Sequence, residues 1–423
     1  MNTFTHKLRL IVEDRTLLRR ILFVVFALAV FRLGAAVPIP GVNVAALQSF
    51  FSGNQFFGLL NIFSGGGLAN LSIFMLGVGP YITSSIILQL LTIMFPVLKE
   101  MWHEEGEMGR RKFAQYSRLL TVPLAAIQGF GFLVLLENQG VIVHLTALDR
   151  IVNVLTVVGG SLFLMWLGEL IAEYGIGNGV SLIIFAGILA RIPTVIGQLA
   201  ANFEVAQLPI YLAFLVAALA IIAGIVVITE AERPIAVTYA KQVRGNKVYG
   251  GASTYLPIRF NQAGVMPIIF ALSILLFPQL IANFLTRFSN SIIQTVSGAV
   301  LAVLNNAWAY AALYFIFVFL FTYFYSALTF DPESVATNLQ KGGAFIPGIR
   351  PGRPTAEYVA RVLYRLTFIG ALFLGVVAML PLIMKAVTGI ASLAIGGTAI
   401  LIVVSVALDF MKQIDAQLSM REY

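Results

Sequence analysis

Cysteine is absent from this chain of 423 residues, so the chain forms neither disulfides nor a thiolate metal site. Histidine is almost as rare: His6, His103 and His144 are the only three, and all fall in expected tails or loops. A serine protease acting inside a membrane needs a base such as histidine beside its serine, and a zinc protease needs a His-Glu-x-x-His helix. The sequence holds neither arrangement, so we expect no enzyme, no catalytic or metal-binding residue and no cofactor.

Charged residues are scarce as well, at 11% of the chain against 59% hydrophobic residues. Apolar runs of about twenty residues recur along the whole length, which is typical of a polytopic membrane protein. Asp409, Glu169 and Glu230 stand at the ends of such runs, and the paired mid-membrane carboxylates of an ion-coupled transporter are missing. The sequence therefore favours a pore with an apolar lining. A secondary transporter of a small solute is the next alternative, and an intramembrane enzyme is the third.

The apolar runs predict an all-α protein with ten transmembrane helices. They lie at Leu22–Val37, Leu71–Val97, Leu119–Leu136, Ile151–Ala172, Val180–Leu199, Pro209–Ile228, Gly264–Leu285, Trp308–Phe330, Leu366–Met384 and Leu393–Met411. An external linker at 200–208 separates two five-helix halves, 22–199 and 209–411, and an odd number of spans per half gives the halves opposite orientations, as in inverted-repeat transport folds. Residues 1–21 and 412–423 form the two tails.

Basic residues gather on one side of the expected bundle. The two tails and the loops after the second, sixth and eighth helices hold 22 of the 27 lysines and arginines. Cytoplasmic segments carry such an excess, so we expect both termini in the cytoplasm. Residues Met1–Arg20 are polar and lead straight into a spanning helix, which predicts that there is no removable signal peptide.

Two of the cytoplasmic loops, 233–262 and 331–365, are long. The first contains Arg244-Gly245-Asn246-Lys247 between short apolar runs of period two, which predicts a β-hairpin. In the second, residues 342–352 hold too much proline and glycine for regular structure but enough constraint for a defined tip at Arg350. The excess of basic residues that sets membrane orientation would by itself explain why these loops are basic. Their length favours a docking surface for an anionic or acidic partner.

The stretch from Asn54 to Pro96 begins with an apolar segment too short to cross a bilayer. The glycines Gly65, Gly66 and Gly67 interrupt it before the next long apolar run starts at Leu71. A half-helix that re-enters the membrane is tolerated only inside protein or beside a water-filled cavity. The alternative, an external loop followed by an ordinary helix, is equally compatible with this stretch.

Two apolar pairs follow glycine-rich turns. Val78 and Ile82 lie four residues apart in the second expected helix, and Val180 and Ile184 do so in the fifth, so each pair shares one helix face. Converging apolar side chains can close a pore by excluding water from it. Ordinary helix packing gives the same spacing and is the simpler interpretation.

Several ordered motifs carry a family resemblance. They are Val37-Pro38-Ile39-Pro40-Gly41, Asn61-Ile62-Phe63-Ser64-Gly65-Gly66, Gly79-Pro80-Tyr81-Ile82, Glu105-Gly106-Glu107-Met108-Gly109-Arg110-Arg111-Lys112, Tyr174-Gly175-Ile176-Gly177-Asn178-Gly179 and Phe345-Ile346-Pro347-Gly348-Ile349-Arg350-Pro351-Gly352. Through them the chain resembles, almost end to end, the SecY family of central subunits of the bacterial protein-conducting channel.

The resemblance implies an hourglass pore that opens sideways to lipid, and it assigns residues to four places. A re-entrant plug at about Gln55–Gly67 includes Phe57, Leu59, Leu60, Asn61, Ile62, Phe63, Ser64 and Gly65. The pore ring is Val78, Ile82, Val180, Ile184, Ile269 and Ile402. A lateral gate between the second and third and the seventh and eighth helices carries Thr83, Gln128 and Ser273. The docking loops present Arg244, Lys247 and Arg350.

The resemblance also implies partners and a location. They are the small membrane subunits SecE and SecG, the SecA motor, the ribosome, a precursor polypeptide with its signal sequence, and the lipid of the bacterial cytoplasmic (inner) membrane. Direct DNA binding is not expected.

Overall fold

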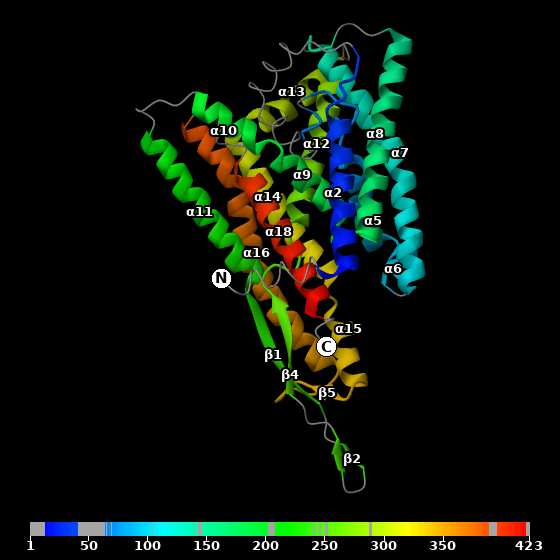
Figure 1. Cartoon of the computed structure of the whole chain (residues 1–423), viewed down its shortest axis with the longest axis vertical. Coiled ribbons are helices and arrows are strands. Elements are labelled where there is room, and N and C mark those ends of the chain that lie inside the picture. Colours follow the sequence, from blue (N-terminus) through cyan, green and yellow to red (C-terminus); the bar gives the residue numbers. More distant parts are fainter. Residues whose placement is uncertain are drawn as a thin grey trace.

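The structure, a computed structural model, describes residues 13–40, 64, 66–68, 70–103, 105–138, 140–142, 146–201, 208–239, 242–244, 247–249, 253–286, 290–388 and 396–419. Figure 1 shows a bundle of long helices with a small β region projecting from one end of it. The polypeptide chain leaves the bundle for this β region after α11 and returns to it through α12.

The described helices account for most of the molecule. They are α2 (Arg15–Ala35), α5 (Gly79–Met94), α6 (Pro96–His103), α7 (Gly106–Asn138), α8 (Ala147–Tyr174), α9 (Gly179–Leu189), α10 (Ile192–Ala201), α11 (Leu208–Glu230), α12 (Met266–Leu285), α13 (Ser291–Asn305), α14 (Ala307–Thr329), α15 (Pro332–Lys341), α16 (Arg353–Thr388) and α18 (Gly396–Ser419). Each of the ten expected segments overlaps at least one of them. By length and composition, five helices of the described chain can cross a membrane, or six if the bent pair α5–α6 counts as one span.

Local sequence explains where several helices begin. Asp14 caps α2, because its Oδ1 accepts hydrogen bonds from the backbone N–H of Thr16 at 2.9 Å and of Leu17 at 3.3 Å. Asn306 caps α14 in the same way, accepting from the N–H groups of Trp308 and Ala309. Such side chains satisfy backbone donors that have no partner inside the helix.

The second expected helix, Leu71–Val97, is wrong at both ends. Residues 71–78 form turns, and α5 begins only at Gly79. Gly77 has φ +57°, a conformation outside any right-handed helix. At the other end the chain bends by 116° between α5 and α6, where Phe95 is extended and Pro96 follows. The residue before a proline avoids the helical region, so Phe95 ends the helix.

The fifth expected helix, Val180–Leu199, is also interrupted, since α9 ends at Leu189 and α10 begins at Ile192. Pro193 stands in the first turn of α10, where its missing N–H costs nothing, so it favours a new helix start there. Two helices were not expected at all, α13 and α15. Both begin at a polar cap, Asn290 and Asp331, whose side chains accept backbone N–H bonds. His103, expected in a loop, closes α6.

The two long loops fold together. Strands β4 (Ser253–Arg259), β1 (Glu232–Tyr239) and β5 (Ala344–Phe345) form an antiparallel sheet in that order. A separate hairpin pairs β2 (Gln242–Arg244) with β3 (Lys247–Tyr249), which confirms the predicted hairpin. The strand β5 corrects the expectation that residues 342–352 lack regular structure. Apolar residues from both loops and from the start of α16 share one small core, including Val237, Ile346 and Val359.

The largest core lies in the middle of the bundle. It joins residues of α2, the turn before α5, α5, α8, α9, α11, α12, α13, α14, α16 and α18. A second core packs α7 against α8 and against residues 68–76. Helices from both halves of the sequence therefore meet in one central cluster, and residues distant in the chain can act there together.

Candidate pore, gate and docking surface

The start of α5 holds its first pore candidate rigidly. Val78 is the N-cap residue of α5 and is fully buried. Just before it, the carbonyl of Gly77 accepts a hydrogen bond of 3.0 Å from Ser161 Oγ on α8. The turn is thus attached to a neighbouring helix, and Ile82 follows one helical turn later on the same face.

The start of α9 is built differently. Gly177 has φ +88°, and Asn178 caps the helix by accepting a 3.2 Å hydrogen bond from the N–H of Ser181. Gly179 packs directly against the backbone carbonyl of Gly168 on α8, so that no side chain could fit there. This close approach fixes the position of Val180 and Ile184.

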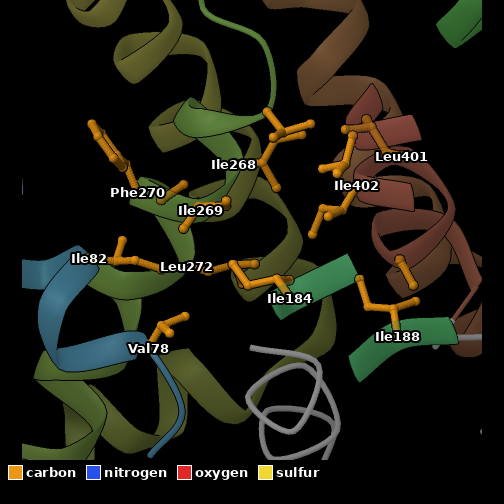
Figure 2. Packing of buried hydrophobic residues seen from close by; sticks show 14 of the residues in the cluster. Val78, Ile82, Ile184, Ile188, Ile268, Ile269, Phe270, Leu272, Leu401 and Ile402 are labelled. Atoms are coloured by element: carbon orange, nitrogen blue, oxygen red, sulfur yellow. The ribbon is translucent and has the colours of Figure 1, made fainter. Parts of the chain in front are cut away.

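All six expected ring residues meet in the central cluster. Val78, Ile82, Ile184, Ile269 and Ile402 are buried members of it, and Val180 is half-buried and packs against it. They come from four elements: α5 with the turn before it, α9, α12 and α18. Figure 2 shows Ile82, Ile184, Ile269 and Ile402 approaching one region from different sides. The structure brings these residues together, while their action as a seal stays a prediction.

Neighbours that sequence reasoning missed belong to the same cluster. Ile188, Ile268, Phe270, Leu272 and Leu401 are buried there too. Ile188 continues the spacing of Val180 and Ile184 by one more turn, so that pattern could have found it. Leu272 has no comparable signal, because its place depends on how α12 packs.

A cavity of about 290 Å³ adjoins one side of the cluster. Its walls include cluster members Leu182, Val265 and Val406, and the polar residues Asn178, Ser181, Asn261, Gln262, Thr329 and Ser405. Arg259, Asp409 and Lys412 add charge. Lys412 Nζ forms a 2.8 Å ion pair with Glu230 Oε1, and Asp409 accepts a 3.1 Å hydrogen bond from Gln413. The cavity is therefore lined by polar, charged and apolar side chains and borders the apolar central cluster.

The three expected gate residues lie on helices that touch, since α12 contacts both α5 and α7. Thr83 and Gln128 are buried and Ser273 is half-buried. Thr83 donates a 2.9 Å hydrogen bond to Gly79 O in its own helix, and no hydrogen bond joins these three described side chains to one another. Polar contacts do connect neighbours within the N-terminal half: Ser84 donates to Ser117 O, and Arg118 Nε pairs with Glu169 Oε1 at 2.7 Å.

Arg350 lies at an exposed turn directly after β5. Gly348 and Gly352, with φ of +83° and +96°, shape this turn, and the Arg350 carbonyl accepts a 2.8 Å hydrogen bond from Thr355 Oγ1. Arg244 and Lys247 are paired in the backbone register of β2 and β3. The backbone of the turn is held while the guanidinium of Arg350 reaches solvent.

Most of the expected plug lies outside the described residues, namely Phe57, Leu59, Leu60, Asn61, Ile62, Phe63 and Gly65. Ser64 is described and buried, and its Oγ accepts a 2.9 Å hydrogen bond from the N–H of Leu68.

Long apolar helices packed around one buried apolar cluster define an all-α membrane protein. The model of the SecY family matches residues 72–411. The protein translocase subunit SecY of Mycobacterium bovis is 43% identical over 426 residues, which cover 96% of each chain. A solved structure of a protein conducting channel has a TM-score of 0.66 at 18% identity and covers 96% of this chain and 93% of its own. Sec61 in the canine ribosome-channel complex from the endoplasmic reticulum has a TM-score of 0.64 at 17% identity, with the same coverage.

The chain therefore belongs to the SecY family. Membership in this family of transport proteins confirms that it is not an enzyme.

Proposed function

We propose that this protein is the pore-forming subunit of a protein translocase in the bacterial cytoplasmic membrane. It moves secretory precursors across the membrane and releases membrane proteins sideways into lipid. The observation that carries the proposal is the convergence of the ring residues from α5, α9, α12 and α18 next to a polar cavity. Its similarity to a protein translocase subunit and to a protein conducting channel supports it.

An apolar ring suits such a channel for a physical reason. A pore that passes chains of many sizes cannot close around them with fixed polar contacts, but branched apolar side chains yield to a chain and close again. They cannot replace the hydration shell of an ion, so a narrow ring of them resists ion passage. The segment Gln55–Gly67 adds a second barrier as a plug.

The lateral gate lies between α5 and α7 on one side and α12 and α14 on the other. Apolar packing dominates this boundary, and Thr83, Gln128 and Ser273 share no hydrogen bond across it. Interhelical hydrogen bonds in membranes contribute only about 0.6 kcal/mol each on average. Separating the two sides of the gate therefore breaks few polar interactions. The apolar helix of a signal sequence can then insert between them.

The β region and the Arg350 turn dock the partner that drives the precursor, either the SecA motor or the ribosome. The ribosome is present in the complex of the canine Sec61 relative. An exposed arginine on a fixed turn can bind a carboxylate or a phosphate through two parallel hydrogen bonds. The small subunits SecE and SecG complete the assembly. Both termini lie in the cytoplasm, and the polar cavity opens on the cytoplasmic side of the protein.

Reconstitution in vesicles tests the proposal. The protein is inserted with SecE and SecG and supplied with SecA, ATP and a secretory precursor. Precursor that becomes resistant to external protease supports a protein-conducting channel. Proton- or sodium-coupled uptake of a small solute with no protected precursor would overturn it in favour of a secondary transporter.

A further inference from the structure

Helix α13 lies at the end of the bundle opposite the β region, which is the external end in the orientation proposed above (Figure 1). Its 15 residues are apolar on average but too few to cross a bilayer, which takes about 20. A single residue, Asn306, joins it to α14. The backbone of Asn306 is extended, with ψ 117°, and its side chain caps α14. The chain therefore turns between the two helices, and α13 does not continue the span that α14 begins.

One face of α13 packs on the rest of the bundle. Ser297 and Leu304 are buried, and Leu304 belongs to the central cluster, against which Val300 also packs. These three residues follow at intervals of three and four positions, so they lie on one side of the helix. The helix contacts both α12 and α14. It is thus attached to the bundle through this side, and most of its remaining surface is exposed.

The exposed surface of α13 divides into an apolar side and a polar side. At about 100° per residue, each set occupies its own sector of the helix, and neither overlaps the packed face. The apolar side consists of Ile292, Val296, Ala299 and Val303. The polar side consists of the polar or small residues Ser291, Gln294, Thr295, Gly298, Ala302 and Asn305. Ile292 is 74% exposed, Val296 56% and Val303 48%, so the apolar side is open along its whole length.

The neighbouring residues indicate what covers the apolar side. The sequence has no charged residue and no histidine from Phe288 to Phe330, a stretch that contains α13 and all of α14. By length and composition α14 can cross a membrane, and its residues Ile316 and Leu320 are exposed. Trp308, in the first turn of α14, is 60% exposed, and tryptophan is enriched where a spanning helix meets the membrane surface. Helix α13 ends three residues before Trp308, so it lies at the depth of the membrane–water interface.

We propose that α13 lies in the plane of the external membrane surface, with its apolar side among the lipid acyl chains of the outer leaflet and its polar side in water. A helix with this division of side chains binds the interface through the apolar area that it buries there. Because α13 carries no charge, it binds the acyl region that membrane lipids share and not an anionic headgroup. Through Leu304 the same helix reaches the central cluster, so it connects the outer-leaflet lipid with the core of the protein.

The first test uses the absence of cysteine, which allows one introduced cysteine to be labelled at a time. Val296→Cys, Gln294→Cys and Ile316→Cys each receive a nitroxide spin label. The full chain, with cysteine-free small subunits, is reconstituted in vesicles of phosphatidylethanolamine and phosphatidylglycerol. Collision of each label with oxygen, which concentrates in lipid, is compared with collision with a water-soluble nickel complex.

We expect the oxygen-to-nickel collision ratio to be severalfold higher at Val296 than at Gln294, because the two positions lie on different sides of the helix. The ratio should be higher still at Ile316, which is exposed well inside α14. Equal ratios at Val296 and Gln294 overturn the proposal. A label at Val296 that is shielded from both reagents also overturns it, in favour of a protein partner on this side.

The second test measures depth with a fluorescent label on the same cysteines and nitroxide-bearing phospholipids. The label at Val296 should be quenched severalfold more by a nitroxide near the headgroup than by one near the end of the acyl chain, and this order should reverse at Ile316. Stronger quenching at Val296 by the deep nitroxide, or quenching by neither, contradicts the interfacial position. Neither test uses a precursor, so a negative result leaves the proposed function intact, and a loss of precursor protection would count against that function alone.

Discussion

The central apolar cluster and the Arg350 turn differ in almost every physical respect. The cluster is buried, uncharged and assembled from helices of both halves of the sequence, and its ring residues come from four of them. The turn is exposed, charged and shaped by residues within a few positions of one another. In the proposed function, the cluster closes the pore and the turn binds the partner that drives transport. Damage to one should leave the function of the other intact.

The largest effect is expected from reversing the charge at the Arg350 turn. Arg350→Glu should abolish SecA- or ribosome-driven transport of a precursor, because it reverses the charge presented to the partner, and it should leave membrane insertion and resting ion conductance unchanged. Protease protection of precursor in proteoliposomes measures the transport. Arg361→Glu is the control, since it makes the same charge change at an exposed position on α16. Normal transport by the Arg350 variant would remove the docking role.

The next largest effect is expected from making the apolar ring in the cluster polar. Ile82→Ser with Ile184→Ser should raise resting ion conductance manyfold, because hydroxyls stabilise water in the constriction. Single-channel recording in planar bilayers measures it. Leu164→Ser is the matched control: it is buried in the same cluster but lies on α8, outside the ring. If the double variant conducts no more than this control, the ring residues do not form the constriction.

Removal of Leu59–Gly65 tests the second barrier. The shortened channel should still translocate, but it should flicker open at rest, with a smaller mean conductance than the double serine variant, because the apolar ring remains. Single-channel recording in planar bilayers measures how much the plug segment and the apolar ring each reduce the resting conductance. A deletion variant that is as silent as the parent would show that this segment does not contribute to the seal.

The sequence predicted those features that depend on neighbouring residues. The hairpin at Arg244–Lys247 follows from its turn residues, and the pairs Val78/Ile82 and Val180/Ile184 follow from helical spacing. The misplaced start of α5 depended on the positive φ of Gly77, which a long apolar run conceals. Which side of α13 stays exposed was not predictable, because it depends on how this helix packs on α12 and α14. The plug assignment stays a prediction.

A smaller effect is expected from displacing α9, one of the helices that form the cluster. Gly179→Ala would place a methyl group against the Gly168 carbonyl and force α9 away from α8. We expect a loss of about 1–3 kcal/mol in the free energy of unfolding, measured by thermal unfolding in detergent. Gly159→Ala is the control, because a methyl group there meets nothing within 4 Å and should be neutral or slightly stabilising. Equal melting temperatures for both variants would contradict the close packing of α9 on α8.

The smallest effect concerns the boundary between the cluster and the lipid. Gln128 is buried on α7 beside α12 yet shares no hydrogen bond with Thr83 or Ser273, so in the proposed gate it gives the closed state little polar stabilisation. Gln128→Leu replaces an amide with an apolar group and should make the closed state more stable by no more than about 1 kcal/mol. A strong signal sequence has binding energy in excess of this difference and should be accepted as before. Weak signal sequences, which open the gate only marginally, should be translocated severalfold less. Ranking a graded series of signal sequences by protease protection measures this, and an unaltered ranking across the series would argue that Gln128 lies outside the gate.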